Sequence, residues 1–169
     1  MRLLMDFLSE HNRPGSLTPL LYKLWHDSAI DALCENPYLL CDPYYDVEFR
    51  IADGLAMELG LSLLSDERAD AGVLYTLTFN LDNGHTFIPM EKLTHTVCVL
   101  LSDEDVEFDE ARALESILRL SERGKLVREQ IAGRDAVYLR SIHDSEAYLA
   151  ALLGGMAERC FLYDFDVDE

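Results

Sequence analysis

Residues 36–60, NPYLLCDPYYDVEFRIADGLAMELG, predict the end of one short helix, a turn and then a second short helix. A helix that precedes Pro37 must end there, because the residue before a proline avoids the α region. Asp42-Pro43 then opens a turn. The stretch from about Val47 to Leu59 predicts a helix that Gly60 closes, since a glycine just past the last turn accepts a left-handed conformation. The apolar face of this helix comprises Phe49, Ala52, Ala56 and Leu59.

The preceding residues predict further short helices. Apolar residues recur at helical spacing between Leu3 and Leu8, and the segment 12–15 ends that helix. Thr18 before Pro19 indicates a capped helix start, and Ser28 indicates the cap of the helix that ends before Pro37. The N-terminal part is therefore expected to be a bundle of four short helices.

The second half mixes helices with short strands. Ser65 predicts a helix cap, Gly124 a helix end, and Gly133 the turn of a β-hairpin. The predicted order is a helix, a strand, two helices, a hairpin and a final helix, at about 66–81, 85–88, 90–100, 108–121, 125–139 and 145–159. This is the order of a winged-helix module. We predict a mainly α fold with a winged-helix-like module and a small β-hairpin after a boundary near residue 62.

The charge of the chain limits its ligands. Its 169 residues include 14 Lys and Arg against 32 Asp and Glu, a formal net charge of −18. Such a surface repels phosphate, which argues against a broad basic face for duplex DNA and against an anionic membrane. A local contact through backbone N–H groups needs no basic patch. No apolar run approaches about 18 residues and the four cysteines are dispersed, so we expect a cytoplasmic chain with reduced thiols.

The motifs of several enzyme classes are missing from the sequence. It has neither of the glycine-rich phosphate loops GxxxxGKS/T and GxGxxG, no GxSxG elbow and no HExxH group. Asp103, Asp105 and Glu107 match the spacing of a calcium loop, but Phe108 and Leu114 occupy positions that require Gly and Glu. We therefore predict no catalytic residue, no metal site and no cofactor in these residues.

Residues 36–40, together with 49–56 and Leu59-Gly60, resemble the helix-hairpin-helix region in the N-terminal part of RecD-like ATP-dependent DNA helicases, the exodeoxyribonuclease V alpha subunit family. Segments similar to that family follow in the same order at 68–77, 84–89, 124–127, 137–139 and 145–147. The resemblance covers about residues 3–155, nearly the whole chain.

In such helicases this region lies upstream of the motor, which carries the Walker motifs and uses ATP and Mg²⁺. The resemblance thus implies DNA as a ligand, helicase motor domains as a partner in cis, and ATP and Mg²⁺ for the motor only. Since no Walker motif is present, we expect a fragment of a longer helicase. Its expected parts are a helix-hairpin-helix bundle at 1–62, the winged-helix-like module with its C-terminal helix at 63–157, and an acidic tail or linker to the motor at 158–169.

The hairpin departs from the family's pattern. A phosphate-binding hairpin typically has the form GxG, because two glycines let the backbone turn tightly and expose its N–H groups at a helix N-terminus. The corresponding residues are Asp46, Val47 and Glu48, so carboxylates replace both glycines. Arg50 follows, but one cation does not offset two carboxylates. We interpret this degenerate hairpin as a structural turn with a weakened DNA contact.

The module offers a second candidate for DNA contact. Its expected recognition helix at 108–121 carries more acids than bases, which is a poor probe for the major groove. The candidate DNA-binding residues are instead the basic cluster Arg123, Lys125, Arg128, Arg134 and Arg140. The alternative is that these side chains alternate between faces of a hairpin and pair with acids, where each pair contributes little.

Three functions remain to be compared. The first is a non-catalytic accessory region of a RecD-like helicase, which positions DNA or the motor. The second is an acidic protein-interaction module that binds a basic protein partner and has lost DNA binding. The third, a small independent enzyme, requires His and carboxylate side chains to converge from distant parts of the chain.

Overall fold

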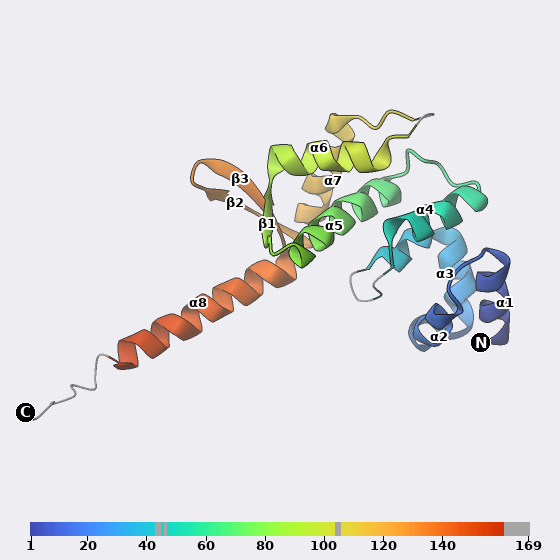
Figure 1. Ribbon diagram of the computed structural model, residues 1–169, viewed down its shortest axis with the longest axis horizontal. Helices are drawn as coiled ribbons and strands as arrows, with labels where there is room; N and C mark the ends of the chain where they lie inside the picture. Colours follow the sequence, from blue (N-terminus) through green and yellow to red (C-terminus); the bar gives the residue numbers. More distant parts are fainter. Residues whose placement is uncertain (43–44, 46, 104–105, 161–169) are drawn as a thin grey trace, which may run out of the picture.

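The computed structural model describes residues 1–42, 45, 47–103 and 106–160, with side chains as far as residue 157 (Figure 1). The N-terminal part is a bundle of short helices. They are α1 (Arg2–Glu10), α2 (Thr18–Trp25), α3 (Ala29–Glu35) and α4 (Phe49–Glu58), with the 3-10 turns η1 (Gly15–Leu17), η2 (His26–Ser28) and η3 (Pro37–Cys41) between them. Each helix turns leucines inward, and Leu8, Leu21, Leu33 and Leu55 are fully buried. Burial of each such side chain contributes about 1.5–3 kcal/mol.

The second part combines helices with a small sheet. Its elements are α5 (Asp66–Asp82), β1 (Phe87–Pro89), α6 (Met90–Leu101), α7 (Glu110–Glu122), β2 (Leu126–Ile131), β3 (Arg134–Leu139) and α8 (Arg140–Cys160). The strands form an antiparallel sheet in the order β1-β3-β2, with Ile88 opposite Val137 and Leu126 opposite Leu139. The fold class is therefore confirmed as mainly α with a small antiparallel sheet, in the element order expected from the sequence.

Glycines follow the ends of three helices, and those at Gly60 and Gly124 are the ends that the sequence predicts. Gly60, Gly84 and Gly124 have φ of +73°, +82° and +71°, a conformation that side chains disfavour. After α4, the Leu61 N–H donates to the carbonyl of Ala56 at 2.9 Å, which satisfies an otherwise open helix end. Gly84 and Gly124 are followed by the same kind of bond at the ends of α5 and α7.

Of the helix caps predicted at Thr18, Ser28 and Ser65, one is present in the structure. The Ser65 hydroxyl accepts the Arg68 N–H at 3.2 Å and caps α5 as predicted. Thr18 and Ser28 do not cap with their side chains. A 3-10 turn runs directly into each of these helices, so the backbone at Thr18 (φ −54°, ψ −50°) is already helical, whereas a cap requires an extended conformation.

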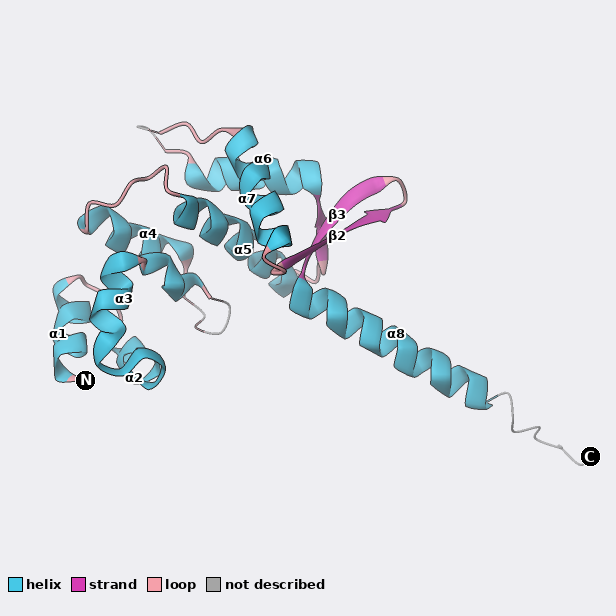
Figure 2. Ribbon diagram, turned by 180° about the vertical axis from the view of Figure 1, so that it is seen from behind, coloured by secondary structure: helices cyan, strands magenta, loops and turns pink. Residues whose placement is uncertain are grey.

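Helix α8 begins at Arg140, five residues before the predicted start at Ser145, because no helix-breaking residue separates it from β3. It contacts β2 and β3 and then extends away from the rest of the molecule (Figures 1 and 2). Its distal part exposes large apolar side chains: Tyr148, Leu149, Leu152, Leu153 and Met156. Among the described residues, none of the helices combines the length and apolarity that a membrane span requires.

A buried ion pair joins the bundle to α5. The guanidinium of Arg68, whose side chain is 2% exposed, donates to both carboxylate oxygens of Asp53 on α4, at 2.8 and 3.0 Å. Its remaining Nη1 donates to the carbonyls of Leu63 and Leu101, at 3.0 and 2.8 Å. The hydroxyl of Tyr38 in η3 donates to the same Asp53 at 2.7 Å. One arginine thus fixes η3, α4, α5 and the end of α6 together.

Arg68→Ala is expected to lower the free energy of unfolding by about 3–5 kcal/mol, because it leaves the Asp53 carboxylate buried without its counter-charge. Arg2→Ala is the control, since the Arg2 side chain is 92% exposed and lies 4.0 Å from Asp6. Loss of that exposed pair should leave the stability unchanged. Urea unfolding of both variants measures the difference, and equal stabilities would contradict the expectation.

Candidate nucleic-acid interface

The hairpin lies between η3 and α4. Asn36 caps η3, where its side-chain oxygen accepts the Tyr38 N–H at 3.0 Å. At the other side of the hairpin Val47 is buried in the core, and Glu48 is the exposed N-cap residue of α4, without a side-chain cap bond. Asp46 lies outside the described residues. The Glu48 carboxylate therefore lies at the helix start where a phosphate would bind, and the exposed Arg50 follows in the first turn.

The five basic residues of the second candidate do not form one surface. Arg123 bonds to Asp70 at 3.1 Å, while Arg140 donates to the carbonyl of Gly124 at 2.9 Å and lies 3.9 Å from Asp144. In the antiparallel register Arg128 lies opposite Val137, whereas Arg134 lies opposite Ile131. Because neighbouring strand positions point to opposite faces, this register places Arg128 and Arg134 on different faces of the hairpin.

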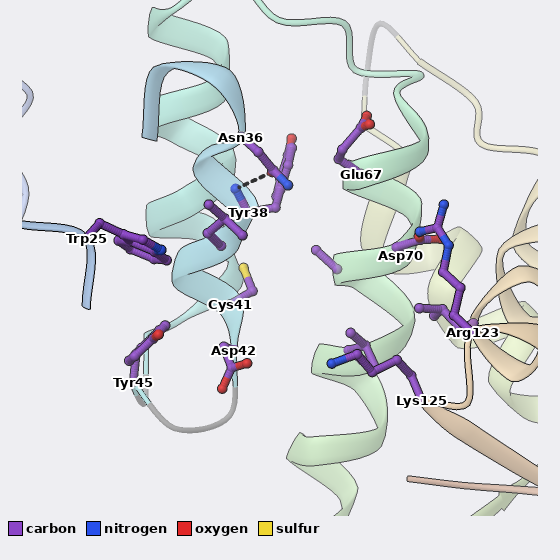
Figure 3. Close-up of a pocket in the computed structure, with 14 residues that line it drawn as sticks. Trp25, Asn36, Tyr38, Cys41, Asp42, Tyr45, Glu67, Asp70, Arg123 and Lys125 are labelled. Carbon is purple, nitrogen blue, oxygen red and sulfur yellow. Dashed lines mark hydrogen bonds and ion pairs between the residues drawn. The ribbon is translucent and has the colours of Figure 1, made fainter. Parts of the chain in front are cut away.

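Lys125 and Arg123 reach a cleft of about 290 Å³ between the bundle and the second part of the fold. Trp25 and Tyr45 lie on the bundle side of this cleft (Figure 3). The centroids of their rings are 6.3 Å apart. Lys125 extends from the start of β2 toward the bundle, whereas Arg123 turns toward Asp70 (Figure 3). The acids that line the cleft are Asp42, Glu67 and Asp70. They outnumber its two cations, so the cleft does not favour phosphate.

Asp70 organises the α7 side of the cleft. Its carboxylate accepts from Ser116 at 2.7 Å, from Arg119 at 2.7 Å and from Arg123 at 3.1 Å. This carboxylate raises the pKa of the Arg119 guanidinium, which stays charged. Arg119 on the expected recognition helix and Arg123 on the adjacent turn therefore hold α7 against α5.

Two acidic residues before α7, Asp103 and Asp109, accept hydrogen bonds from nearby backbone N–H groups. The Asp103 carboxylate accepts the Val106 N–H at 2.8 Å, and the Asp109 carboxylate caps α7 through the Ala111 N–H at 3.2 Å. Asp105 lies outside the described residues. No group of three or more His, Cys, Asp or Glu side chains is placed to hold a metal ion within the described ranges.

A comparison of the sequence with models of known protein families identifies the family of this chain. Residues 1–87, half of the chain, match the model of the ATP-dependent RecD2 DNA helicase HHH domain. The chain belongs to this family. The match confirms the resemblance carried by residues 36–60, and it extends through α5 to the first residue of β1. The HHH domain is a non-catalytic domain of a helicase, so this chain is a RecD-like helicase accessory region.

A second set of surface residues, which lies partly in the RecD2 HHH domain and partly on α6, was not identified from the sequence. Tyr75 and Phe79 on α5 and Lys92 on α6 line a groove with Arg50 next to the hairpin. The signal was present in the sequence as two aromatic residues four positions apart, which share one face of a helix. Only the structure brings Arg50 and Lys92 to the same groove.

Buried polar groups beside the cleft have altered ionisation. Burial raises the pKa of the Cys41 thiol to about 12, and the charge of Asp53 adds to this effect. Burial also raises the pKa of Tyr38, together with its hydrogen bond to Asp53. Both side chains stay neutral in the folded chain and ionise first in the unfolded chain. Stability is therefore expected to fall as the pH rises above about 9.

Cys41 should resist alkylation by iodoacetamide at pH 8, because only about one thiol in ten thousand is the reactive thiolate at a pKa near 12. Cys34 is the internal control, since it is exposed on α3. Mass spectrometry after timed labelling measures both sites in one sample. We expect rapid modification of Cys34 and modification of Cys41 only after unfolding in urea. Equal labelling rates in the folded chain would contradict the burial of Cys41.

Proposed function

We propose that this accessory region acts with helicase motor domains in cis during DNA unwinding and repair, and that it positions the motor or the strand that enters it. In this proposal the region makes a weak contact with DNA and leaves ATP and Mg²⁺ to the motor. The family match supports the helicase context.

The observation that supports a weak DNA contact is that several arginines form ion pairs with carboxylates inside the fold. Arg13 bonds to Glu58 at 2.9 Å, Arg68 to Asp53, and Arg119 to Asp70, and each of these pairs joins two different segments. Cations that stabilise the fold in this way are not available to phosphates. Glu48 at the start of α4 adds a repelling carboxylate at the hairpin itself.

The hairpin can be tested by restoring its glycines. Asp46→Gly/Glu48→Gly should tighten binding to a labelled DNA fork by about tenfold, or ~1.4 kcal/mol, because two carboxylates no longer repel the phosphates. Fluorescence anisotropy at about 0.05 M salt measures the affinity, since electrostatic binding weakens steeply as salt rises. Asp27→Asn/Asp31→Asn removes the same charge elsewhere in the bundle and is the control. An equal gain in both double variants would show a general charge effect and contradict a specific role of the hairpin.

The basic cluster is tested in the same assay. Arg123→Ala/Lys125→Ala/Arg128→Ala should weaken fork binding severalfold and reduce its salt dependence, because fewer counterions are released. Lys23→Ala removes an exposed cation on α2, outside this cluster, and should change neither quantity. An unchanged affinity of the triple variant would remove these residues from the DNA contact.

The alternative function is an acidic protein-interaction module. The observation that favours it is the row of exposed apolar side chains on α8, since a projecting apolar surface of this kind marks a protein contact. The two functions differ in one measurement. An accessory region with a DNA contact shifts fork DNA at about 0.15 M salt, whereas an interaction module that has lost DNA binding does not.

A further inference from the structure

A row of aromatic rings runs from the core to the surface beside the hairpin. Tyr38 and Phe49 are stacked at 6.0 Å, Phe49 and Tyr75 are 5.9 Å apart, and Tyr75 and Phe79 are stacked at 6.3 Å with 28° between their planes. The exposed fraction rises from 2% at Phe49 to 56% at Phe79. The exposed ring is thus supported from behind by rings that are fixed in the core.

Phe79 forms one wall of a groove of about 430 Å³, which lies between the first turn of α4, α5 and α6. In both ribbon views α5 runs between α4 and α6 (Figures 1 and 2). Arg50 from α4 and Lys92 from α6 border the same groove. Glu48 is the one acidic side chain among the described residues that line it.

Among the described side chains, the two cations of this groove differ from the arginines that join segments of the fold. Within the described ranges neither Arg50 nor Lys92 takes part in an ion pair, whereas Arg13, Arg68 and Arg119 are all paired with carboxylates. The chain carries a net charge of −18, so a groove in which two cations outnumber one carboxylate beside an exposed aromatic ring is a local exception. Aromatic rings in a positively charged groove are the combination that binds single-stranded nucleic acid.

We propose that this groove binds a single-stranded DNA segment, with a base stacked on Phe79 and the flanking phosphates held by Arg50 and Lys92. A duplex fits the site poorly, because its base faces are already stacked on one another. The polar side chains in the groove are engaged with their own helices: Asn80 donates to the carbonyl of Thr76 at 2.9 Å, and Thr96 to that of Lys92 at 2.8 Å. Binding should therefore show little base specificity.

This inference deepens the proposed function by naming the form of DNA that the region contacts. Phe79, Arg50 and Lys92 are unchanged in both variants tested above, and Glu48 is the one residue lining the groove that the hairpin variant alters. The two unpaired cations favour a nucleic acid as the ligand of this groove, because an apolar peptide would not require positive charges there.

The test uses the full 169-residue chain and a labelled oligo-dT of about 15 nucleotides, with anisotropy measured at about 0.05 M salt. Phe79→Ala is expected to weaken binding about 5- to 100-fold, the effect of losing one stacked base. Phe79→Trp should preserve the affinity, because indole also stacks. Tyr148→Ala removes an aromatic residue that is 71% exposed on α8 and should have no effect.

The phosphate contacts are tested by Arg50→Ala/Lys92→Ala. This variant should weaken oligo-dT binding and lower the slope of log affinity against log salt by about one, whereas Lys23→Ala should leave the slope unchanged. If the Phe79→Ala and Tyr148→Ala variants bind oligo-dT with equal affinity, the proposal that the groove binds single-stranded DNA is overturned. Such a result would favour a protein as the ligand of the groove. If the basic-cluster variant alone then loses fork binding, the proposed function stands without the groove.

Discussion

The ion pair between Asp53 and Arg68 is the constraint on which the arrangement of the molecule depends. Both side chains are buried, so each charge requires the other, and the carbonyls of Leu63 and Leu101 complete the coordination of the guanidinium. A buried pair of this kind adds little net stability compared with apolar packing, but it tolerates few alternative geometries. It therefore fixes the orientation of the helix-hairpin-helix elements relative to α5 and α6.

The same principle recurs at the surface of the bundle and at α7. Glu58 on α4 receives Arg13 and His11 from the segment after α1, and Asp70 on α5 receives Arg119 and Arg123. Carboxylates on α4 and α5 thus act as acceptors for arginines from neighbouring segments. These pairs explain why several arginines of this strongly acidic chain are not available to a ligand. The net charge alone does not show which cations are available to a ligand. It does not distinguish a cation on the surface from one that forms an ion pair within the fold.

Most of the fold was predictable because its signals are local. Gly60, Gly84 and Gly124 mark helix ends through their own backbone conformation, and Ser65 caps α5 through a residue three positions away. The errors have a different origin. Thr18 and Ser28 depend on the 3-10 turns that precede them. The groove at Phe79 was less predictable still, because it depends on contacts between distant segments. The alternation of basic side chains between hairpin faces was one of two interpretations that the sequence left open, and the strand register places Arg128 and Arg134 on different faces.

The position of Trp25 makes the cleft observable by spectroscopy. It is the only tryptophan of the chain, and its ring lies beside Tyr45 on the bundle side of the cleft. Its intrinsic emission is therefore governed by the polarity at the junction of the two parts of the fold. Movement of the bundle away from α5 would hydrate the indole and shift its emission to longer wavelength. Fraying of the distant α8 would leave the signal unchanged, so one native chromophore separates these two motions without any label.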